Sequence, residues 1–257
     1  MKLIWTYDGK MSKGDDTSKN RIILINYYVH SILTAKKFGY TTIIYCDSES
    51  KKYFDNIVDE LVVVDSYEDS IIWDYMKVKV LEDREDDFYL IDGDVILHDK
   101  LPPFRTLYYS NYDIVFDTYE TANWRDEYMD TVIQLDNLNI KNVIPYWVIN
   151  RLPIISTGVL FLHPKYRKEY VSEFKKCNSF INKFKSTENF HKDHISLVGG
   201  QFLLTIFCET NYLSKMNINN NMGDLGTCYK HHFGKTKFNN PIVPTDYMIT
   251  KDKMGLI

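Results

Sequence analysis

The sequence is poor in the residues that mark several classes of protein. Its four cysteines are scattered and form no CxxC pair, which argues against a disulfide framework or a structural zinc site and favours free thiols in a reducing compartment. Only 11 Gly and 7 Pro occur in 257 residues, far fewer than in disordered or fibrous chains. We therefore expect a folded globular protein with a cytoplasmic location.

Long uninterrupted hydrophobic runs are also missing. The best candidate for a membrane span, Val143–Pro164, is broken by Asn150, Arg151 and Pro153, and the apolar run Ile195–Cys208 is too short to cross a bilayer. The first residues, MKLIWTYDGK, lack the apolar core of a secretory signal. The sequence predicts no transmembrane segment and no signal peptide.

Neither sign of charge dominates the chain. It carries 31 Lys and Arg against 35 Asp and Glu, a formal net charge of −4. Proteins that bind nucleic acid through its phosphates usually have a basic surplus. We expect no nucleic-acid partner.

The first ninety residues alternate between strand and helix patterns. Short apolar segments rich in β-branched or aromatic residues predict strands at Lys2–Tyr7, Thr41–Cys46, Leu61–Val64 and Phe88–Ile91. Apolar residues at helical spacing predict helices from Ser18 to Gly39 and from Ser70 to Leu81, with a short helix at Glu49–Asn56. This alternation is typical of a parallel sheet covered by helices on both faces.

The rest of the chain is less regular. The patterns predict strands at Tyr112–Phe116 and Ile154–Leu162 and helices at Tyr166–Phe184 and Ser196–Thr210, and the tail from Asn217 shows no clear pattern. No repeat or linker divides the sequence. We predict a single α/β domain over residues 1–257, with a mostly parallel central sheet flanked by helices and with two halves, 1–110 and 111–257.

One pair of acidic residues directly follows a predicted buried strand. Asp92-Gly93-Asp94 comes after FYLI and before Val95-Ile96-Leu97. Ligands of parallel α/β sheets bind at the carboxyl ends of the strands, and two carboxylates at this spacing can hold one divalent cation, while Gly93 allows a phosphate to approach the backbone. Because a plain polar turn rarely needs two acids inside an apolar run, the pair indicates a metal site.

An acidic pair of this kind also occurs in two other classes of site. An EF-hand loop would need Gly and Glu where Leu97 and Pro103 stand, which excludes it. A phosphohydrolase that uses Asp92 as its nucleophile also has this acidic pair after a strand, but it normally continues with Thr or Val where Ile96 stands. This reading is kept as an alternative.

A second motif lies far downstream, at His231-His232-Phe233-Gly234-Lys235-Thr236-Lys237. His231 can serve as a metal ligand, Gly234 permits close approach of a ligand to the backbone, and Lys237 supplies a cation for phosphate. Alone, the pattern also fits a surface loop. Together with the acidic pair it predicts a site for a metal ion and a phosphorylated ligand.

These motifs and their order resemble those of the GT-A glycosyltransferases, in particular glycogenin and the related bacterial galactosyltransferases. In that family an acidic pair is followed by a strand of the type N-[SA]-G-V, by a helix beginning D-Q and by HxxGxxKPW. The corresponding segments here are FYLIDGDVIL at 88–97, ISTGVLFLHP at 155–164, GGQFLLTIF at 199–207 and HHFGKTK at 231–237.

The resemblance implies a GT-A fold and a metal-dependent transferase. It implies that Asp92, Asp94 and His231 hold Mn²⁺ or Mg²⁺ against the diphosphate of a nucleotide-sugar donor, most often a UDP-sugar, with Asp94 also counted as catalytic. Gly234 and Lys237 would contact the same diphosphate. The first half would then bind the nucleotide-sugar. The second would face the acceptor (a glycan, a protein or a small molecule) and carry the metal-binding C-terminal loop.

The resemblance assigns further residues to the donor site. Thr6, Tyr7 and Asp8 match the stretch that holds the nucleoside, and Lys77 is near the position of a donor-binding lysine. The donor set also includes the residues Gly93, Ser156 and Gly158, and Gln201 would face the donor sugar as a second catalytic residue.

The sequence departs from the family pattern at three places. Ser156 replaces the usual Asn, Gly200 replaces the Asp before Gln201, and Phe238-Asn239 replaces Pro-Trp. The missing acid leaves the stereochemical outcome open, and if the reaction inverts, Asp117, Asp193 and Glu209 are candidates for the base that deprotonates the acceptor. A sugar-nucleotide-binding relative without catalytic activity is therefore a third reading.

Overall fold

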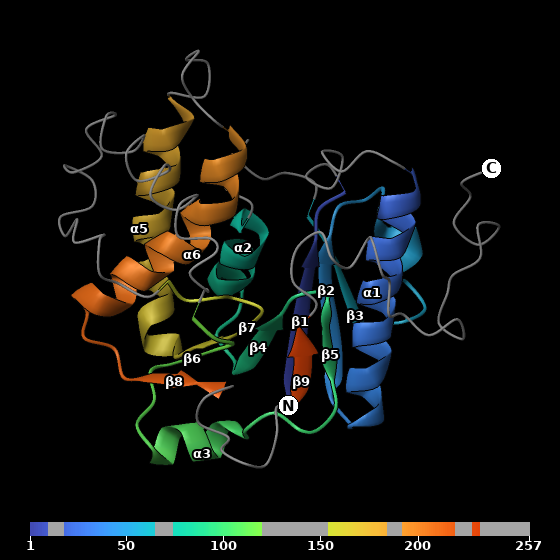
Figure 1. The fold of residues 1–257 in the computed structure, drawn as a ribbon, viewed down its shortest axis with the longest axis horizontal. Helices are drawn as coiled ribbons and strands as arrows, with labels where there is room; N and C mark the ends of the chain where they lie inside the picture. The colour runs from blue at the N-terminus through green and yellow to red at the C-terminus, as the bar shows by residue number, and fades with distance from the viewer. Residues whose placement is uncertain (10–17, 65–73, 120–153, 184–191, 219–227, 232–257) are drawn as a thin grey trace.

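The computed structural model describes residues 1–9, 18–64, 74–119, 154–183, 192–218 and 228–231. Its centre is a seven-stranded sheet in the order β3-β2-β1-β4-β7-β6-β8 (Figure 1). The strands are β1 (Lys2–Tyr7), β2 (Thr41–Cys46), β3 (Glu60–Val63), β4 (Phe88–Ile91), β6 (Ile114–Phe116), β7 (Val159–Leu162) and β8 (Lys215–Asn217). All pairings are parallel except those of β7 with its neighbours β4 and β6. The predicted α/β class with a mostly parallel sheet is confirmed.

Helices cover both faces of this sheet. They are α1 (Ser18–Lys37), α2 (Tyr75–Asp83), α3 (Phe104–Tyr109), α5 (Pro164–Asn182) and α6 (Lys192–Thr210). Figure 1 shows α2, α5 and α6 on one side and α1 on the other. Among the described residues, no helix combines the length and apolar character needed to cross a bilayer.

The alternation of strand side chains divides the core into two clusters. In β1, Leu3 and Trp5 pack toward α1, whereas Ile4 packs toward α2 and α5. Successive side chains of a strand point to opposite faces, so these almost fully buried strands need apolar residues at nearly every position. For this reason the sequence reads as continuous apolar runs rather than as alternating ones.

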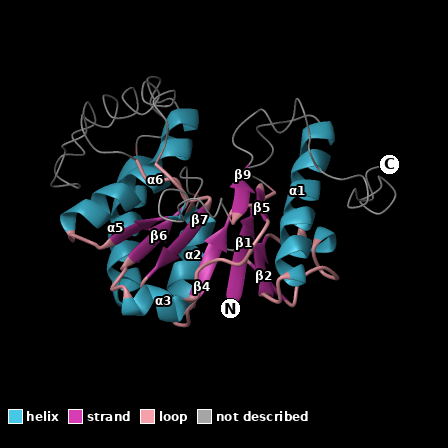
Figure 2. Cartoon of the chain, turned by 60° about the horizontal axis from the view of Figure 1, so that its bottom comes forward, coloured by secondary structure: helices cyan, strands magenta, loops and turns pink. Residues whose placement is uncertain are grey.

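A second sheet of two strands lies beside the first. Here β5 (Val95–Leu97) pairs antiparallel with β9 (Tyr229–His231), and Figures 1 and 2 both place this pair between α1 and the central sheet. Ser31 of α1 donates a hydrogen bond to the Val95 carbonyl at 2.6 Å and accepts one from the Trp5 indole at 3.0 Å. These two hydrogen bonds connect α1, β1 and β5 at Val95, the residue that follows the acidic pair in the sequence.

Several predicted bounds agree with the structure and others do not. β1, β2 and β4 have the predicted limits, and Gly39, with φ of +80°, follows the end of α1 as a left-handed residue. The strand predicted at Ile154–Leu162 begins only at Val159. Two further predictions were wrong. The short helix at Glu49–Asn56 is only a 3₁₀ turn at Lys51–Tyr53, and the tail after Asn217 contains β9.

Candidate active site

The acidic pair occupies a tight turn between β4 and β5. The Asp92 amide donates to the Gly158 carbonyl at 2.8 Å, and the Val95 amide donates to the Asp92 carbonyl at 3.1 Å. The first bond continues the pairing of β4 with β7. The turn therefore begins at the carboxyl end of a central strand, where a ligand site was expected.

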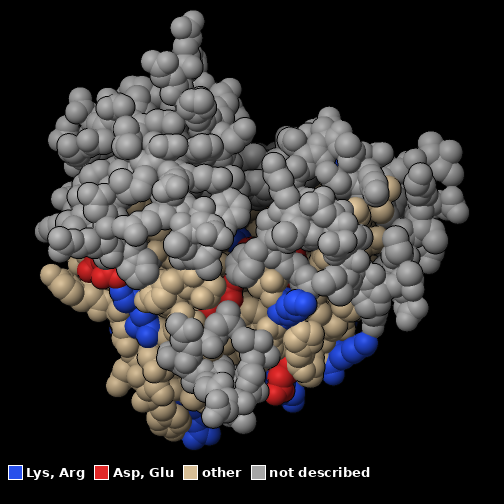
Figure 3. Space-filling view, in the orientation of Figure 1, with Lys and Arg blue, Asp and Glu red and all other residues tan. Residues whose placement is uncertain are grey.

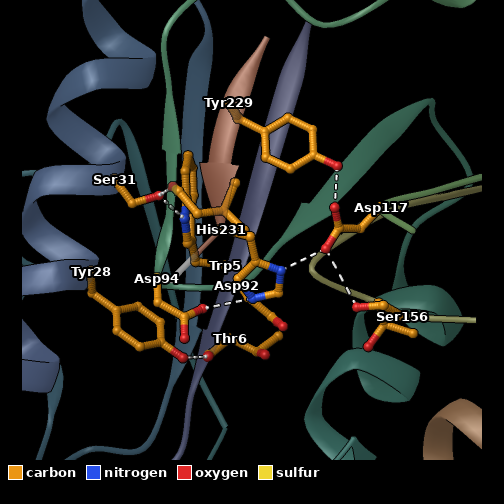
Figure 4. Close-up of polar contacts among 12 residues, drawn as sticks. Trp5, Thr6, Tyr28, Ser31, Asp92, Asp94, Asp117, Ser156, Tyr229 and His231 are labelled. Atoms are coloured by element: carbon orange, nitrogen blue, oxygen red, sulfur yellow. Dashed lines mark hydrogen bonds and ion pairs between the residues drawn. The ribbon is translucent and has the colours of Figure 1, made fainter. Parts of the chain in front are cut away.

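Gly93 is needed here because another side chain fills the adjacent space. A Cβ at this position would lie 2.1 Å from the ring of Tyr28. Tyr28 belongs to α1, and its hydroxyl donates to the carbonyl of Thr6 at 2.8 Å (Figure 4). The ring thus links the end of β1 to the acidic turn, a role that the sequence analysis did not foresee.

β9 brings His231 to this turn from far along the chain. His231 stands opposite Val95 in the β5–β9 register, and its Nε2 lies 3.3 Å from Oδ1 of Asp94. Potential ligand atoms of Asp92, Asp94 and His231 all lie within 4.8 Å of one another. Side-chain exposure is 10% for Asp94 and 8% for His231. The structure therefore gathers the predicted metal-ligand set.

The other nitrogen of His231 contacts Asp117. Nδ1 lies 2.6 Å from Oδ2 of Asp117, a residue that directly follows β6 and is fully buried. The hydroxyl of Tyr229 donates to the second oxygen of the same carboxylate, and that of Ser156 donates to Oδ2 at 3.4 Å (Figure 4). The ring is thus held between Asp94 on one side and Asp117 on the other.

Lys77 approaches the turn from α2. Its ammonium lies 2.7 Å from Oδ1 of Asp92 and 3.3 Å from Oδ1 of Asp74, and it donates to Oγ1 of Thr157 at 2.9 Å. Its side chain is only 12% exposed. Burial lowers the pKa of Lys77, but the charges and hydrogen bonds of the two carboxylates outweigh burial and raise it. Lys77 is therefore a permanent cation beside the acidic pair.

The electrostatics of the acidic pair favour an added cation. Burial and the charge of Asp94 raise the pKa of Asp92, although Lys77 and His231 act in the opposite direction. Burial lowers the pKa of His231, but the hydrogen bonds and charges of Asp117 and Asp94 raise it to about 10. A divalent ion would relieve the repulsion between the two carboxylates and would displace the proton from Nε2.

The remaining predicted residues fall into different parts of the structure. Thr6 and Tyr7 end β1, next to Tyr28. Asp8 follows them, and its charge acts on the Tyr28 hydroxyl. Gly158 lies against His231, where a Cβ would be 2.3 Å from Cε1 of the ring.

Gln201 is half-buried on α6. It directly follows Gly200, where a Cβ would be 2.0 Å from a carboxylate oxygen of Asp74. The predicted diphosphate contacts Gly234 and Lys237 lie outside the described residues.

Sequence reasoning assigned no role at this site to Asp74, Tyr28 or Tyr229, and considered Asp117 only as a base. A usable signal existed for Asp117, since it follows the apolar segment IVF in the same way as Asp92 follows FYLI. For Tyr28 no local pattern marks the contact, because α1 meets the acidic turn only in the folded chain. Asp74 directly precedes α2 and is connected to the site through its ion pair with Lys77, three residues further along the chain.

The side chains of Asp92, Asp94 and His231 suit a divalent ion of the first transition row or Mg²⁺ as metal ligands. Two ligands on one Mg²⁺ lie at most about 4.2 Å apart, twice a bond of about 2.1 Å, so small side-chain movements would bring the three residues onto one ion. Carboxylate oxygens suit both Mg²⁺ and Mn²⁺, whereas imidazole suits transition metals better. The residues present fit a bound cation.

Comparison with known proteins gives matches only among solved structures. No family model and no curated protein matches the sequence. Similar structures include mouse xyloside xylosyltransferase 1 (11% identity, TM-score 0.47, 95% of this chain and 98% of that one). Another is the galactosyltransferase LgtC in complex with donor and acceptor sugar analogues (11% identity, TM-score 0.49, 100% of this chain and 96% of that one). A third is the glycosyltransferase GlyE of Streptococcus pneumoniae (10% identity, TM-score 0.46, 99% of this chain and 62% of that one).

These three names are those of glycosyltransferases, the class that the sequence motifs resemble.

Proposed function

We propose that this protein is a metal-dependent glycosyltransferase that moves a sugar from a nucleotide-sugar, with a UDP-sugar as the donor, to an acceptor hydroxyl. The observation that carries the proposal is the convergence of Asp92, Asp94 and His231 at the carboxyl end of β4. The same three residues form the ligand set implied by the family resemblance. Two sequence motifs separated by more than a hundred residues thus meet at one point.

In this proposal Asp92, Asp94 and His231 hold Mn²⁺ or Mg²⁺. The chemistry supplied by such an ion is Lewis-acid stabilisation of the negative charge that develops on the leaving diphosphate. Lys77 favours the ionised form of the Asp92 carboxylate, since its ammonium lies 2.7 Å from that carboxylate. Lys237 and the Gly234 backbone are proposed as further contacts of the diphosphate.

The nucleoside is proposed to lie at the end of β1, against Thr6, Tyr7 and Asp8. The bond from Tyr28 to the Thr6 carbonyl places this stretch next to Gly93 and thus next to the metal ligands. A nucleotide bound along β1 would therefore direct its phosphates toward the acidic turn. Ser156, Gly158 and Gln201 are proposed to line the donor sugar from the other side.

The position of His231 favours the transferase over the phosphohydrolase alternative. A phosphohydrolase with Asp92 as nucleophile has no use for a histidine of a distant segment beside Asp94.

Binding of nucleotides tests the proposal. Calorimetric titration of UDP, GDP and their sugar conjugates, with Mn²⁺ and then with a chelator, should show selective, metal-dependent binding of the uridine compounds. Asp94→Asn should abolish it, whereas Asp113→Asn, at the far end of β6, should retain it. Folded wild-type protein that binds no nucleotide under either condition would overturn the proposal.

The compartment proposed for this activity is the cytosol. None of the four cysteines forms a disulfide, and all four are buried in the structure. Free thiols are the usual state in a reducing compartment.

A further inference from the structure

A buried carboxylate behind the metal-ligand histidine has no role in the ligand set itself. Asp117 is fully buried, and its Oδ2 lies 2.6 Å from Nδ1 of His231, on the side of the ring opposite Asp94. A buried carboxylate is costly unless it accepts hydrogen bonds. Asp117 meets this requirement by accepting bonds from the ring and from the hydroxyls of Tyr229 and Ser156.

The surroundings of this pair come from three separate strands. Asp117 directly follows β6, Tyr229 and His231 belong to β9, and Gly158 directly precedes β7. A Cβ at Gly158 would lie 2.3 Å from Cε1 of His231 and 2.8 Å from Oδ2 of Asp117. The absence of a side chain at 158 is what allows ring and carboxylate to lie together against this strand.

The arrangement determines which nitrogen of the ring faces the acidic turn. Because a carboxylate only accepts hydrogen bonds, Asp117 requires a proton on Nδ1. The nitrogen that can offer a lone pair is then Nε2, which points at Asp94 (Figure 4). Histidine ligands of metals commonly donate their second N–H to such a carboxylate, which fixes the tautomer and strengthens the metal bond.

We propose that Asp117 is a positioning residue, which holds His231 with Nδ1 protonated and Nε2 directed to the metal, and which acts on the reaction only through that histidine. This inference rests on the proposed metal site. It also assigns Asp117 a role other than that of the base for an acceptor hydroxyl. A fully buried carboxylate that already accepts three hydrogen bonds is not placed to take a proton from an acceptor.

The test is the Mn²⁺ affinity of the nucleotide-free protein, measured by electron paramagnetic resonance of free Mn²⁺ at fixed pH. Asp117→Asn should weaken Mn²⁺ binding by about 10- to 100-fold, the range found for such second partners of metal ligands. The matched control is Asp113→Asn, since Asp113 flanks the other end of β6 and accepts a bond from the Ser214 amide at 3.0 Å. The control should bind Mn²⁺ like the wild type, and equal affinity of Asp117→Asn and wild type would overturn the inference.

A double-mutant cycle separates positioning from simple attraction by a nearby negative charge. If Asp117 acts only through His231, then adding Asp117→Asn to a His231→Ala background should change Mn²⁺ affinity by less than about 2-fold. If the full loss persists in that background, Asp117 attracts the ion directly and the inference is wrong. A wild type that binds no Mn²⁺ would instead remove the proposed metal site, and this inference with it.

Two further measurements keep the test decisive. In metal-free wild-type protein, nuclear magnetic resonance should show a strongly deshielded Nδ1 proton of His231, and this signal should be lost in Asp117→Asn and retained in Asp113→Asn. If Asp117→Asn does not fold, Tyr229→Phe takes its place, because it removes one donor to the carboxylate. Tyr229→Phe should lower Mn²⁺ affinity several-fold, and unchanged affinity would count against the inference.

Discussion

Besides Gly9, three described glycines lie where a side chain from another segment fills the space that a Cβ would occupy. Tyr28 lies against Gly93, His231 against Gly158, and Asp74 against Gly200. His231 belongs to the proposed metal-ligand set, Tyr28 lies against the acidic turn, and Asp74 is paired with Lys77. At the scale of single residues, the site therefore depends on missing side chains as much as on those present.

Gly158→Ala should weaken Mn²⁺ binding by at least about 10-fold, because the added Cβ would displace the His231 ring from its bond with Asp117. The thermal midpoint should fall as well, because the buried Asp117 carboxylate would lose its contact with the ring. The control is Gly39→Ala, where the positive φ should cost stability of about 1 kcal/mol but leave Mn²⁺ affinity unchanged. Unchanged Mn²⁺ affinity in Gly158→Ala would contradict the prediction.

Lys77→Met should destabilise the protein by about 3 kcal/mol, because it leaves Asp92 and Asp74 without their shared ammonium. Chemical denaturation in chelator measures this loss. Mn²⁺ should then raise the stability of the variant more than that of the wild type, since the ion replaces a missing charge beside Asp92. An equal Mn²⁺ effect on both proteins would show that Lys77 and the ion do not share that carboxylate.

At the scale of elements, β9, one of the shortest described strands, supplies two side chains of the candidate site. β9 has three residues, yet it supplies both His231 and Tyr229, and its register with β5 fixes their positions along that strand. A segment this short has no periodicity that could reveal it in the sequence. Its placement follows from pairing with β5, whose position is set in turn by the bond from Ser31 to Val95.

Ser31→Ala should destabilise the protein by about 1–3 kcal/mol, because it leaves the Trp5 indole and the Val95 carbonyl without a buried hydrogen-bond partner. Thr34→Ala is the matched control on the same helix, since its hydroxyl bonds only to carbonyls of α1 itself. The difference between the two variants in urea denaturation reports the link between helix and small sheet. Equal stability of the two variants would contradict that role.

The sequence was most informative where a single run of residues decides the structure. β1, β2 and β4 were located because each is an apolar run buried on both faces, and the acidic pair and His231 were found because motif spacing identifies them. α3, β8 and β9 were missed because their short segments depend on partners distant in sequence. The role of Tyr28 was missed for the same reason, since α1 brings this residue to a turn far along the chain.

For the molecule as a whole, the two core clusters enclose every cysteine. Cys46 and Cys228 belong to the cluster beneath α1, and Cys177 and Cys208 to the cluster beneath α5 and α6. Charged residues of both signs are interspersed over the described part of the face shown in Figure 3. The thiols are thus separated from reagents in solvent by the same packing that holds the sheet between its helices.

None of the four thiols should react with a disulfide reagent in the native protein at pH 8. Burial raises the pKa of Cys177 to about 12 and that of Cys228 to about 11, and it raises the pKa of Cys208 as well. The reactive thiolate is therefore scarce below those values. All four should react after unfolding in guanidinium, and rapid native labelling of any one would contradict the packing described.

The central claim is that the acidic pair and His231 form the metal site of a sugar transferase. The most direct test is release of UDP from UDP-sugars by the purified protein, measured with Mn²⁺ and with chelator in wild type, Asp94→Asn and Asp113→Asn. We predict turnover of at least one UDP-sugar that requires Mn²⁺, is lost in Asp94→Asn and persists in Asp113→Asn. UDP release that persists in chelator or in Asp94→Asn would contradict the claim, as would a wild type that binds UDP with Mn²⁺ but turns over no UDP-sugar.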